Sequence, residues 1–205
     1  MSTRPSSKPE SDDASTPIGS GAARNLRYIR DTIDATRTFT TVPGKGCVLM
    51  GVAGLTAAGL ESLPALSGLW LPIWLIAAVV SCTAALYFME RKARAQGLSL
   101  RRSVAWRFFL TLIPAFVVGA VLTAALLEIV GREVIAAIWL LMYGVGLAAC
   151  GTFSIPIVLI AGLAFIGLGT VTLAAPAAWA PALLALGFGG VHIVLGAIIA
   201  RDHGG

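Results

Sequence analysis

Residues 155–175 read IPIVLIAGLAFIGLGTVTLAA, a run of 21 residues without a charged side chain. A helix needs about 20 consecutive apolar residues to cross the hydrocarbon core of a bilayer. The whole chain agrees with this stretch, because 57% of its 205 residues are hydrophobic and only 12% are charged. Soluble domains carry about 25% charged residues. The composition therefore excludes a soluble enzyme and predicts an all-α integral membrane protein.

Similar apolar stretches follow one another through residues 46–200, separated by Pro, Gly and charged residues. We place six transmembrane helices at 46–64, 69–90, 106–128, 133–151, 155–175 and 181–200. The connection between the fourth and fifth helices, Gly151 to Pro156, is very short. These two helices should therefore form a tight antiparallel hairpin. The sequence shows no convincing internal repeat, which disfavours a transporter built from inverted repeats.

The polar ends of the chain flank this transmembrane domain. Residues 1–21 hold almost no apolar side chain and predict a disordered tail. Residues 22–45 form a juxtamembrane segment, in which 24–37 has the spacing of a short amphipathic helix. Its apolar stripe is Leu26, Ile29 and Ile33, opposite Arg24, Arg27 and Arg30. A basic helix of this kind lies on a membrane surface; the alternative is a solvated helical linker. Residues 201–205 are the C-terminal segment.

Lys and Arg set the orientation, since cytoplasmic loops carry an excess of them. Seven precede the first span, six lie from Arg91 to Arg107 in the loop after the second span and at the start of the third, and Arg201 follows the last. Only Arg132 falls on the other side of the membrane. Both termini are therefore predicted to be cytoplasmic, and the cell membrane to be the location. The 14 cations on the cytoplasmic side are Arg4, Lys8, Arg24, Arg27, Arg30, Arg37, Lys45, Arg91, Lys92, Arg94, Arg101, Arg102, Arg107 and Arg201.

The sequence places no Asp, Glu, Lys or Arg in the middle of a span, and His192 is the exception to this apolar pattern. Ala185, Gly189, His192 and Gly196 follow a 4-3-4 spacing and should share one helix face. Small residues on such a face let a neighbouring helix approach closely. His192 could be a ligand, a proton relay or an interhelical hydrogen-bond partner, and we favour the last. Its candidate partners are Thr170, Thr172, Tyr143, Ser81 and Thr123.

Small residues at helical spacing mark further packing seams rather than substrate channels. They are Gly51, Gly54 and Ala58 in the first span, Gly144 and Ala148 in the fourth, and Gly162 and Gly169 in the fifth. The basic loop between the second and third spans can also attract anionic headgroups. Its predicted lipid-facing residues are Arg91, Lys92, Arg94, Arg101 and Arg102. Because membrane topology explains these cations, we predict no nucleic-acid partner.

Motifs of catalysis and cofactor binding are missing from the sequence. It has no P-loop, no dinucleotide fingerprint, no HExxH and no GxSxG. Its three cysteines are isolated in different spans and form no CxxC, so they are interpreted as small apolar packing residues. Four Glu residues lie at span ends, where water should reach them: Glu61, Glu90, Glu128 and Glu133. We therefore predict no catalytic residues, no metal and no cofactor.

Three segments resemble a group of uncharacterised bacterial multi-pass membrane proteins. They are Gly187-Phe188-Gly189-Gly190-Val191-His192-Ile193, with Gly196, Ile198 to Arg201 and Gly204-Gly205 after it; Phe39 to Gly44; and Gly151 to Ser154. The resemblance covers about residues 28–205. It implies a multi-pass membrane protein and brings no activity and no catalytic residue with it.

The sequence supports three hypotheses about function. The first is a non-enzymatic membrane protein, structural or regulatory, whose basic cytoplasmic face meets lipid or a partner. It could act as a homo-oligomer or with another membrane protein. The second is a small transporter or channel subunit with His192 on a polar path. The third, an intramembrane enzyme, has the least support, because one His without a nucleophile is not a site.

The cation asymmetry makes a testable prediction about topology. In a background with Cys47, Cys82 and Cys150 replaced by Ala, single cysteines are placed at Ser67, Ala178 and Ser99. A membrane-impermeant thiol reagent applied outside the cell should modify S67C and A178C and spare S99C, because only the first two lie outside. The reverse labelling pattern would contradict the predicted topology.

Overall fold

The computed structural model describes residues 21, 25–29, 43–95 and 104–203. The chain divides into two units, Met1–Thr36 and Arg37–Gly205, and each is described by itself. In the first, residues 25–29 form a helical turn in which Leu26, Tyr28 and Ile29 are exposed. The remainder of the predicted surface helix at 24–37 and most of the predicted tail lie outside the described residues.

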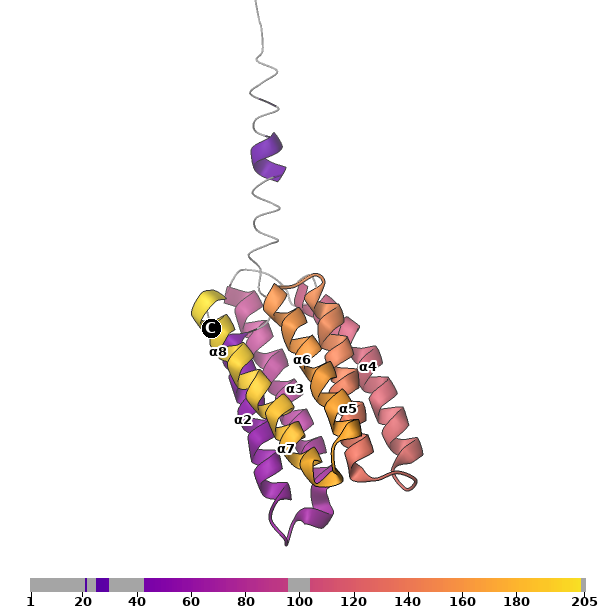
Figure 1. Cartoon of the computed structure of the whole chain (residues 1–205). Coiled ribbons are helices and arrows are strands. Elements are labelled where there is room, and N and C mark those ends of the chain that lie inside the picture. The colour runs from indigo at the N-terminus through magenta and orange to yellow at the C-terminus, as the bar shows by residue number, and fades with distance from the viewer. Residues whose placement is uncertain (1–20, 22–24, 30–42, 96–103, 204–205) are drawn as a thin grey trace, which may run out of the picture. The chain divides into compact units, whose positions relative to one another are not determined.

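The second unit is a bundle of long helices (Figure 1), and its described residues contain no strand. A short 3-10 turn, η1 (Ser67–Leu69), leads into α3, and the last helix is assembled from four consecutive segments. One of these segments, η4, is π-helical. In chain order the helices are α2 (Gly44–Glu61), α3 (Trp70–Ala95), α4 (Val104–Leu126), α5 (Arg132–Gly151), α6 (Pro156–Ala174) and a last helix of η3 (Ala177–Trp179), α7 (Ala180–Leu184), η4 (Ala185–Val191) and α8 (His192–His203).

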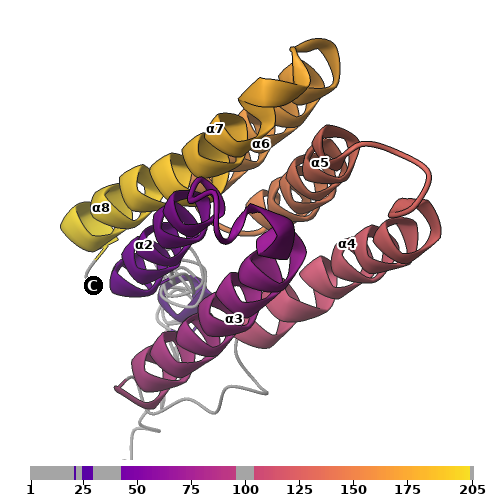
Figure 2. The same ribbon diagram turned by 90° about the horizontal axis from the view of Figure 1, so that it is seen from below.

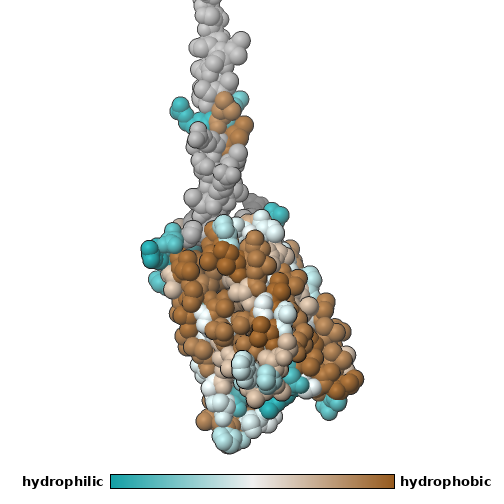
Figure 3. All heavy atoms as spheres, in the orientation of Figure 1, coloured by the Kyte–Doolittle hydropathy of each residue, from teal (hydrophilic) through white to brown (hydrophobic). Residues whose placement is uncertain are grey.

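Five of these helices are long and apolar enough to cross a membrane. They cover Ser67–Ala95, Trp106–Leu126, Arg132–Gly151, Pro156–Ala174 and Ala177–Asp202. Their outward side chains are apolar too, and Figure 3 shows apolar residues over the middle of one face, with hydrophilic ones at its ends. The chain is therefore all-helical in its described part, with the surface of a multi-pass membrane protein. The remaining long helix, α2, is not among these five. It has 18 residues and carries Lys45 and Glu61 near its ends.

Three helices differ from the prediction by more than two residues at a boundary. The last helix runs from Ala177 to His203, beyond the predicted 181–200 at both ends. The sequence places the end of the first span at residue 64, but α2 ends at Glu61. The ring of Pro64 disfavours a helical conformation at Leu63, the residue before it. The sequence places the end of the second span at residue 90, but α3 continues to Ala95. The added residues favour helix, and Arg94 pairs with Glu90 one turn earlier at 2.6 Å.

The helices form two groups of three. In one group α2 packs against both α3 and the last helix, and in the other α5 packs against both α4 and α6. The α5–α6 pair has the most extensive contact, which confirms the predicted tight hairpin. The last helix also contacts α5 and α6 and so joins the groups. In the view from below (Figure 2), α3 and α4 lie on the side of the bundle away from α6 and the last helix.

Glycines lie where the helices of each group approach one another most closely. A Cβ on Gly162 of α6 would meet the backbone nitrogen of Ala148 on α5, and one on Gly144 would lie 2.8 Å from the nitrogen of Ile166. In the other group, a Cβ on Gly51 of α2 would lie 2.8 Å from the carbonyl oxygen of Gly189. Backbone atoms cannot move aside as the end of a flexible side chain can. These glycine positions therefore have no room for a side chain.

Two glycines of α6 give a matched test of the α5–α6 seam. Gly162→Ala should lower the melting temperature in detergent, because the new methyl group would overlap the backbone at Ala148. Gly167 has no atom within 4 Å of an added Cβ, so Gly167→Ala should leave stability unchanged or raise it, since Ala is favoured over Gly in a helix by about 1 kcal/mol. Equal melting temperatures for the two variants would contradict the seam.

Candidate functional site

The centre of the bundle holds one polar pair, His192 at the start of α8 and Tyr143 in α5. His192 is 2% exposed, and its Nε2 lies 2.8 Å from the Tyr143 hydroxyl oxygen. A buried polar group without a partner is costly, and this contact provides one. Of the five candidate partners that the sequence offered, the structure selects Tyr143. The pair links the two groups of helices, since α8 belongs to one and α5 to the other.

The second ring nitrogen of His192, Nδ1, is buried and has no hydrogen-bond partner among the described residues. The Tyr143 hydroxyl has a proton to donate, and Nε2 of His192 is the acceptor within its reach. We therefore assign the hydroxyl as donor and Nε2 as acceptor, which in a neutral imidazole leaves the ring proton on Nδ1.

Aromatic rings surround the pair. Phe165 packs edge-on against both rings, with centroids 4.8 Å from Tyr143 and 5.3 Å from His192. Phe188 stacks on His192 at 6.2 Å, and Phe116 stacks on Tyr143 at 6.0 Å. These rings offer no ligand to a metal and no second proton acceptor beside the pair. Within the described residues, no three His, Cys, Asp or Glu side chains are close enough together to hold a metal ion.

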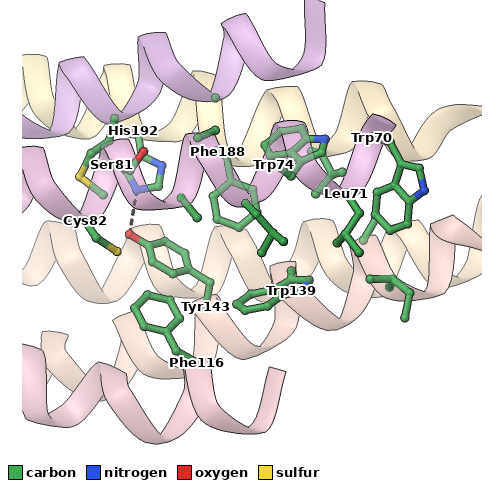
Figure 4. Close-up of a pocket in the computed structure, with 18 residues that line it drawn as sticks. Trp70, Leu71, Trp74, Ser81, Cys82, Phe116, Trp139, Tyr143, Phe188 and His192 are labelled. Carbon is green, nitrogen blue, oxygen red and sulfur yellow. Dashed lines mark hydrogen bonds between the residues drawn. The ribbon is translucent and has the colours of Figure 1, made fainter. Parts of the chain in front are cut away.

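The predicted common face of the last helix is split by the π-helical turn. Gly189 and Gly196 face α2, where added Cβ atoms would meet Leu55 and the carbonyl oxygen of Gly44. His192 instead points toward Tyr143 on α5 (Figure 4). A π-helical turn spreads its residues over a wider turn than an α-helix does, so it shifts His192 around the helix axis relative to Gly189. His192 and Gly196 both follow this segment and keep their spacing of four residues in α8. The predicted common face is therefore kept only in part.

The remaining predicted packing residues lie in two seams. Gly54 is buried against the last helix, where an added Cβ would lie 2.7 Å from the carbonyl carbon of Phe188. Gly144 and Ala148 lie in the seam between α5 and α6. Ala58 differs from the prediction, since it is only half-buried and its neighbour Ala57 is buried in its place.

Three of the predicted lipid-facing cations lie in the last two turns of α3. Arg91 and Arg94 are exposed and Lys92 is half-buried. Arg101 and Arg102 lie outside the described residues. At the same end of the bundle are the start of α2 with Lys45, the start of α4 with Arg107 and the end of α8 with Arg201. Among the described residues of this unit, Arg132 is the one cation at the opposite end.

Glu61 departs from the sequence-based expectation that water reaches it. It is 7% exposed, and the indole nitrogen of Trp74 donates a hydrogen bond to its Oε2 at 2.8 Å. Arg132 lies 3.9 Å from its Oε1 and donates to the backbone oxygen of Ser67 at 3.2 Å. The charges of Glu61 and Arg132 complement each other across the two groups. In the sequence, Arg132 was the one cation predicted on the outer side of the membrane. This was the signal that could have pointed to an anionic partner there.

Two cavities lie on either side of the Tyr143–His192 pair. The larger, about 200 Å³, lies between the two groups on the α3 and α4 side and is drawn in Figure 4. We call it the slot. The smaller cavity, about 50 Å³, lies toward the basic end, near Pro43 and Phe108. Met50, Tyr143 and His192 border both cavities, so they form the partition between them.

The chain matches no protein-family model, no curated protein and no solved structure. The resemblance to bacterial multi-pass membrane proteins therefore stays a prediction.

The Tyr143–His192 contact predicts a modest loss of stability when either partner is removed. Polar contacts between membrane helices contribute about 0.6 kcal/mol on average and about 1.7 kcal/mol at most. Tyr143→Phe and His192→Ala should therefore each lower the melting temperature in detergent slightly. Gly189→Leu should lower it more, because the new side chain would overlap Leu55.

The matched control is Tyr87→Phe, which removes a hydroxyl group from an exposed tyrosine of α3. It should leave the melting temperature unchanged. A Tyr143→Phe protein as stable as the Tyr87→Phe protein would contradict a contribution of the buried hydrogen bond.

Proposed function

We propose that this protein is a non-enzymatic multi-pass protein of the cytoplasmic membrane, structural or regulatory in role. Six helices cross the bilayer, α2 among them, and both termini are cytoplasmic. The basic end meets anionic headgroups, or a partner that carries negative charge. The observation that carries the proposal is the enclosure of His192, whose hydrogen bond to Tyr143 and aromatic surroundings suit an interhelical link better than a relay.

The inclusion of α2 among the spans rests on its packing. It lies between α3 and the last helix and contacts both along its length. Both of those helices are long and apolar enough to cross a membrane. A helix of 18 residues is about 27 Å long at 1.5 Å per residue, close to the hydrocarbon thickness of about 30 Å. Lys45 and Glu61 lie near its two ends, where headgroups and water are available.

The orientation is supported by the distribution of cations over the two ends of the bundle. Lys45, Arg91, Arg94, Arg107 and Arg201 gather at one end. The opposite end carries Glu61, Glu128 and Glu133 besides Arg132. By the positive-inside rule the first end is cytoplasmic. Each cation near an anionic leaflet adds about 1 kcal/mol of attraction, which would hold this end against the lipid surface.

A small transporter or channel subunit is the second candidate function. The observation that favours it is the pair of cavities separated by Met50, Tyr143 and His192. A rearrangement of this partition could connect them. Both cavities are lined almost wholly by apolar side chains, however, and an ion path needs polar groups to replace water of hydration.

Proton flux distinguishes the two functions. The full-length protein is reconstituted into liposomes that contain a pH-sensitive dye, and dye response is followed after a pH jump under a potassium diffusion potential. If His192 has a structural role, the wild type, His192→Ala and the control His203→Ala should all show the same proton leak. Wild-type flux that His192→Ala abolishes and His203→Ala retains would favour the transporter.

A further inference from the structure

The slot forms because α3 and α4 are held by different neighbours. In the described part of the chain α3 packs on α2 and α4 packs on α5, and the two do not pack closely against each other. Small side chains keep the space between the groups open, among them Ala77 and Ala78 on α3 and Ala136 on α5. At about 200 Å³, the space exceeds the roughly 150 Å³ of an engineered apolar cavity that takes up benzene.

The shape of the slot is long and narrow. Its lining on α3 begins at Trp70 and ends at Cys82, which are about 18 Å apart at 1.5 Å per residue. The wall opposite α3 includes the rings of Trp139 and Phe116 (Figure 4). A volume of about 200 Å³ over this length is far too thin for another helix, which is about 10–12 Å wide.

The walls are apolar almost throughout. The indole nitrogens of Trp74 and Trp139 already donate to Glu61 and Thr123. The hydroxyl group of Tyr143 is bonded to His192. A trapped water needs two to four polar partners, and these walls offer few. Water is therefore a poor occupant of the slot.

The slot opens sideways, toward the apolar outer surface of the bundle. Leu75, Ala78 and Cys82 line the slot and are also exposed on the outside of α3. In a helix long and apolar enough to cross a membrane, that surface faces hydrocarbon. The molecules with direct access to the opening are therefore the acyl chains of the bilayer.

We propose that the slot binds one hydrocarbon chain of a membrane lipid, which enters from the bilayer between α3 and α4. This inference goes beyond the proposed structural role, because it gives the protein a ligand. The free-energy gain does not come from leaving water, since lipid tails are already in an apolar medium. It comes from dispersion contacts that the walls of an empty slot lack. Recognition of the lipid then depends on its hydrocarbon chain and not on its headgroup.

The test uses tryptophan fluorescence, because Trp139 lines the slot. A full-length protein that keeps Trp139 and carries Phe at Trp70, Trp74, Trp106 and Trp179 is placed in bilayers of lipids with brominated chains, which quench nearby indoles. Ala78→Phe should fill the slot, because Ala78 lies at the middle of the stripe of α3 that lines it. The matched control is Ala120→Phe, which adds the same ring on the exposed surface of α4, outside the slot.

We expect Trp139 to be quenched in the parent protein and quenching to fall at least two-fold in Ala78→Phe. Ala120→Phe should quench like the parent. Phosphatidylcholine and phosphatidylglycerol with the same brominated chains should quench equally. Equal quenching in Ala78→Phe and the parent, or no quenching of Trp139 at all, would overturn the proposal. If two lipids with the same brominated acyl chains but different headgroups quenched Trp139 to different extents, recognition of the lipid by its acyl chain would be overturned.

Ser81→Phe, which fills the slot from the next turn of α3, replaces Ala78→Phe if that variant loses its helical circular dichroism. Native mass spectrometry of the wild-type protein gives a second readout. It should retain one lipid per chain after detergent extraction, and the slot-filling variant should retain at least two-fold less. Equal retention in both proteins would overturn the proposal as well.

Discussion

The hydrogen bond between Tyr143 and His192 joins two buried side chains across the boundary between two groups of helices. Within each group the helices meet backbone to backbone at glycines such as Gly162 and Gly51. The helices of different groups contact each other less extensively than the helices within a group do. At one end of the bundle Glu61 pairs with Arg132, and Trp74 donates to the same carboxylate. These polar contacts, together with the packing of the last helix on α5 and α6, join the two groups, and the slot is the space that this arrangement leaves between α3 and α4.

The sequence predicted the membrane helices because their length and apolarity are dictated by the bilayer, whatever the neighbours are. Helix ends were less predictable where charge and helix propensity disagree. Arg91 and Lys92 mark where the hydrocarbon region should end, yet the helix continues through them to Ala95, since Arg and Lys favour helix as well as water. At the first span the helix ends at Glu61, three residues before Pro64, because a proline disfavours helix in the residue before it.

The site was predictable only in part. A His inside an apolar span must find a partner, so burial of a polar pair at His192 follows from the sequence. The choice of Tyr143 does not, because it depends on which helices become neighbours. The 3.6-residue period of the sequence also did not predict the π-helical turn from Ala185 to Val191, or the shift of His192 relative to Gly189 that follows from it. Glu61 was misjudged because its burial depends on Trp74 and Arg132, which come from other elements.

The imidazole of His192 gives the most direct measurement of the link between the groups. The protein labelled with ¹⁵N-histidine in lipid bilayers carries only two labelled residues, His192 and His203. Solid-state ¹⁵N NMR at pH 7 should show one neutral imidazole with its proton on Nδ1 and an Nε2 resonance shifted by a hydrogen bond. The shift should disappear in Tyr143→Phe. A charged His192, or a spectrum that Tyr143→Phe leaves unchanged, would contradict the account.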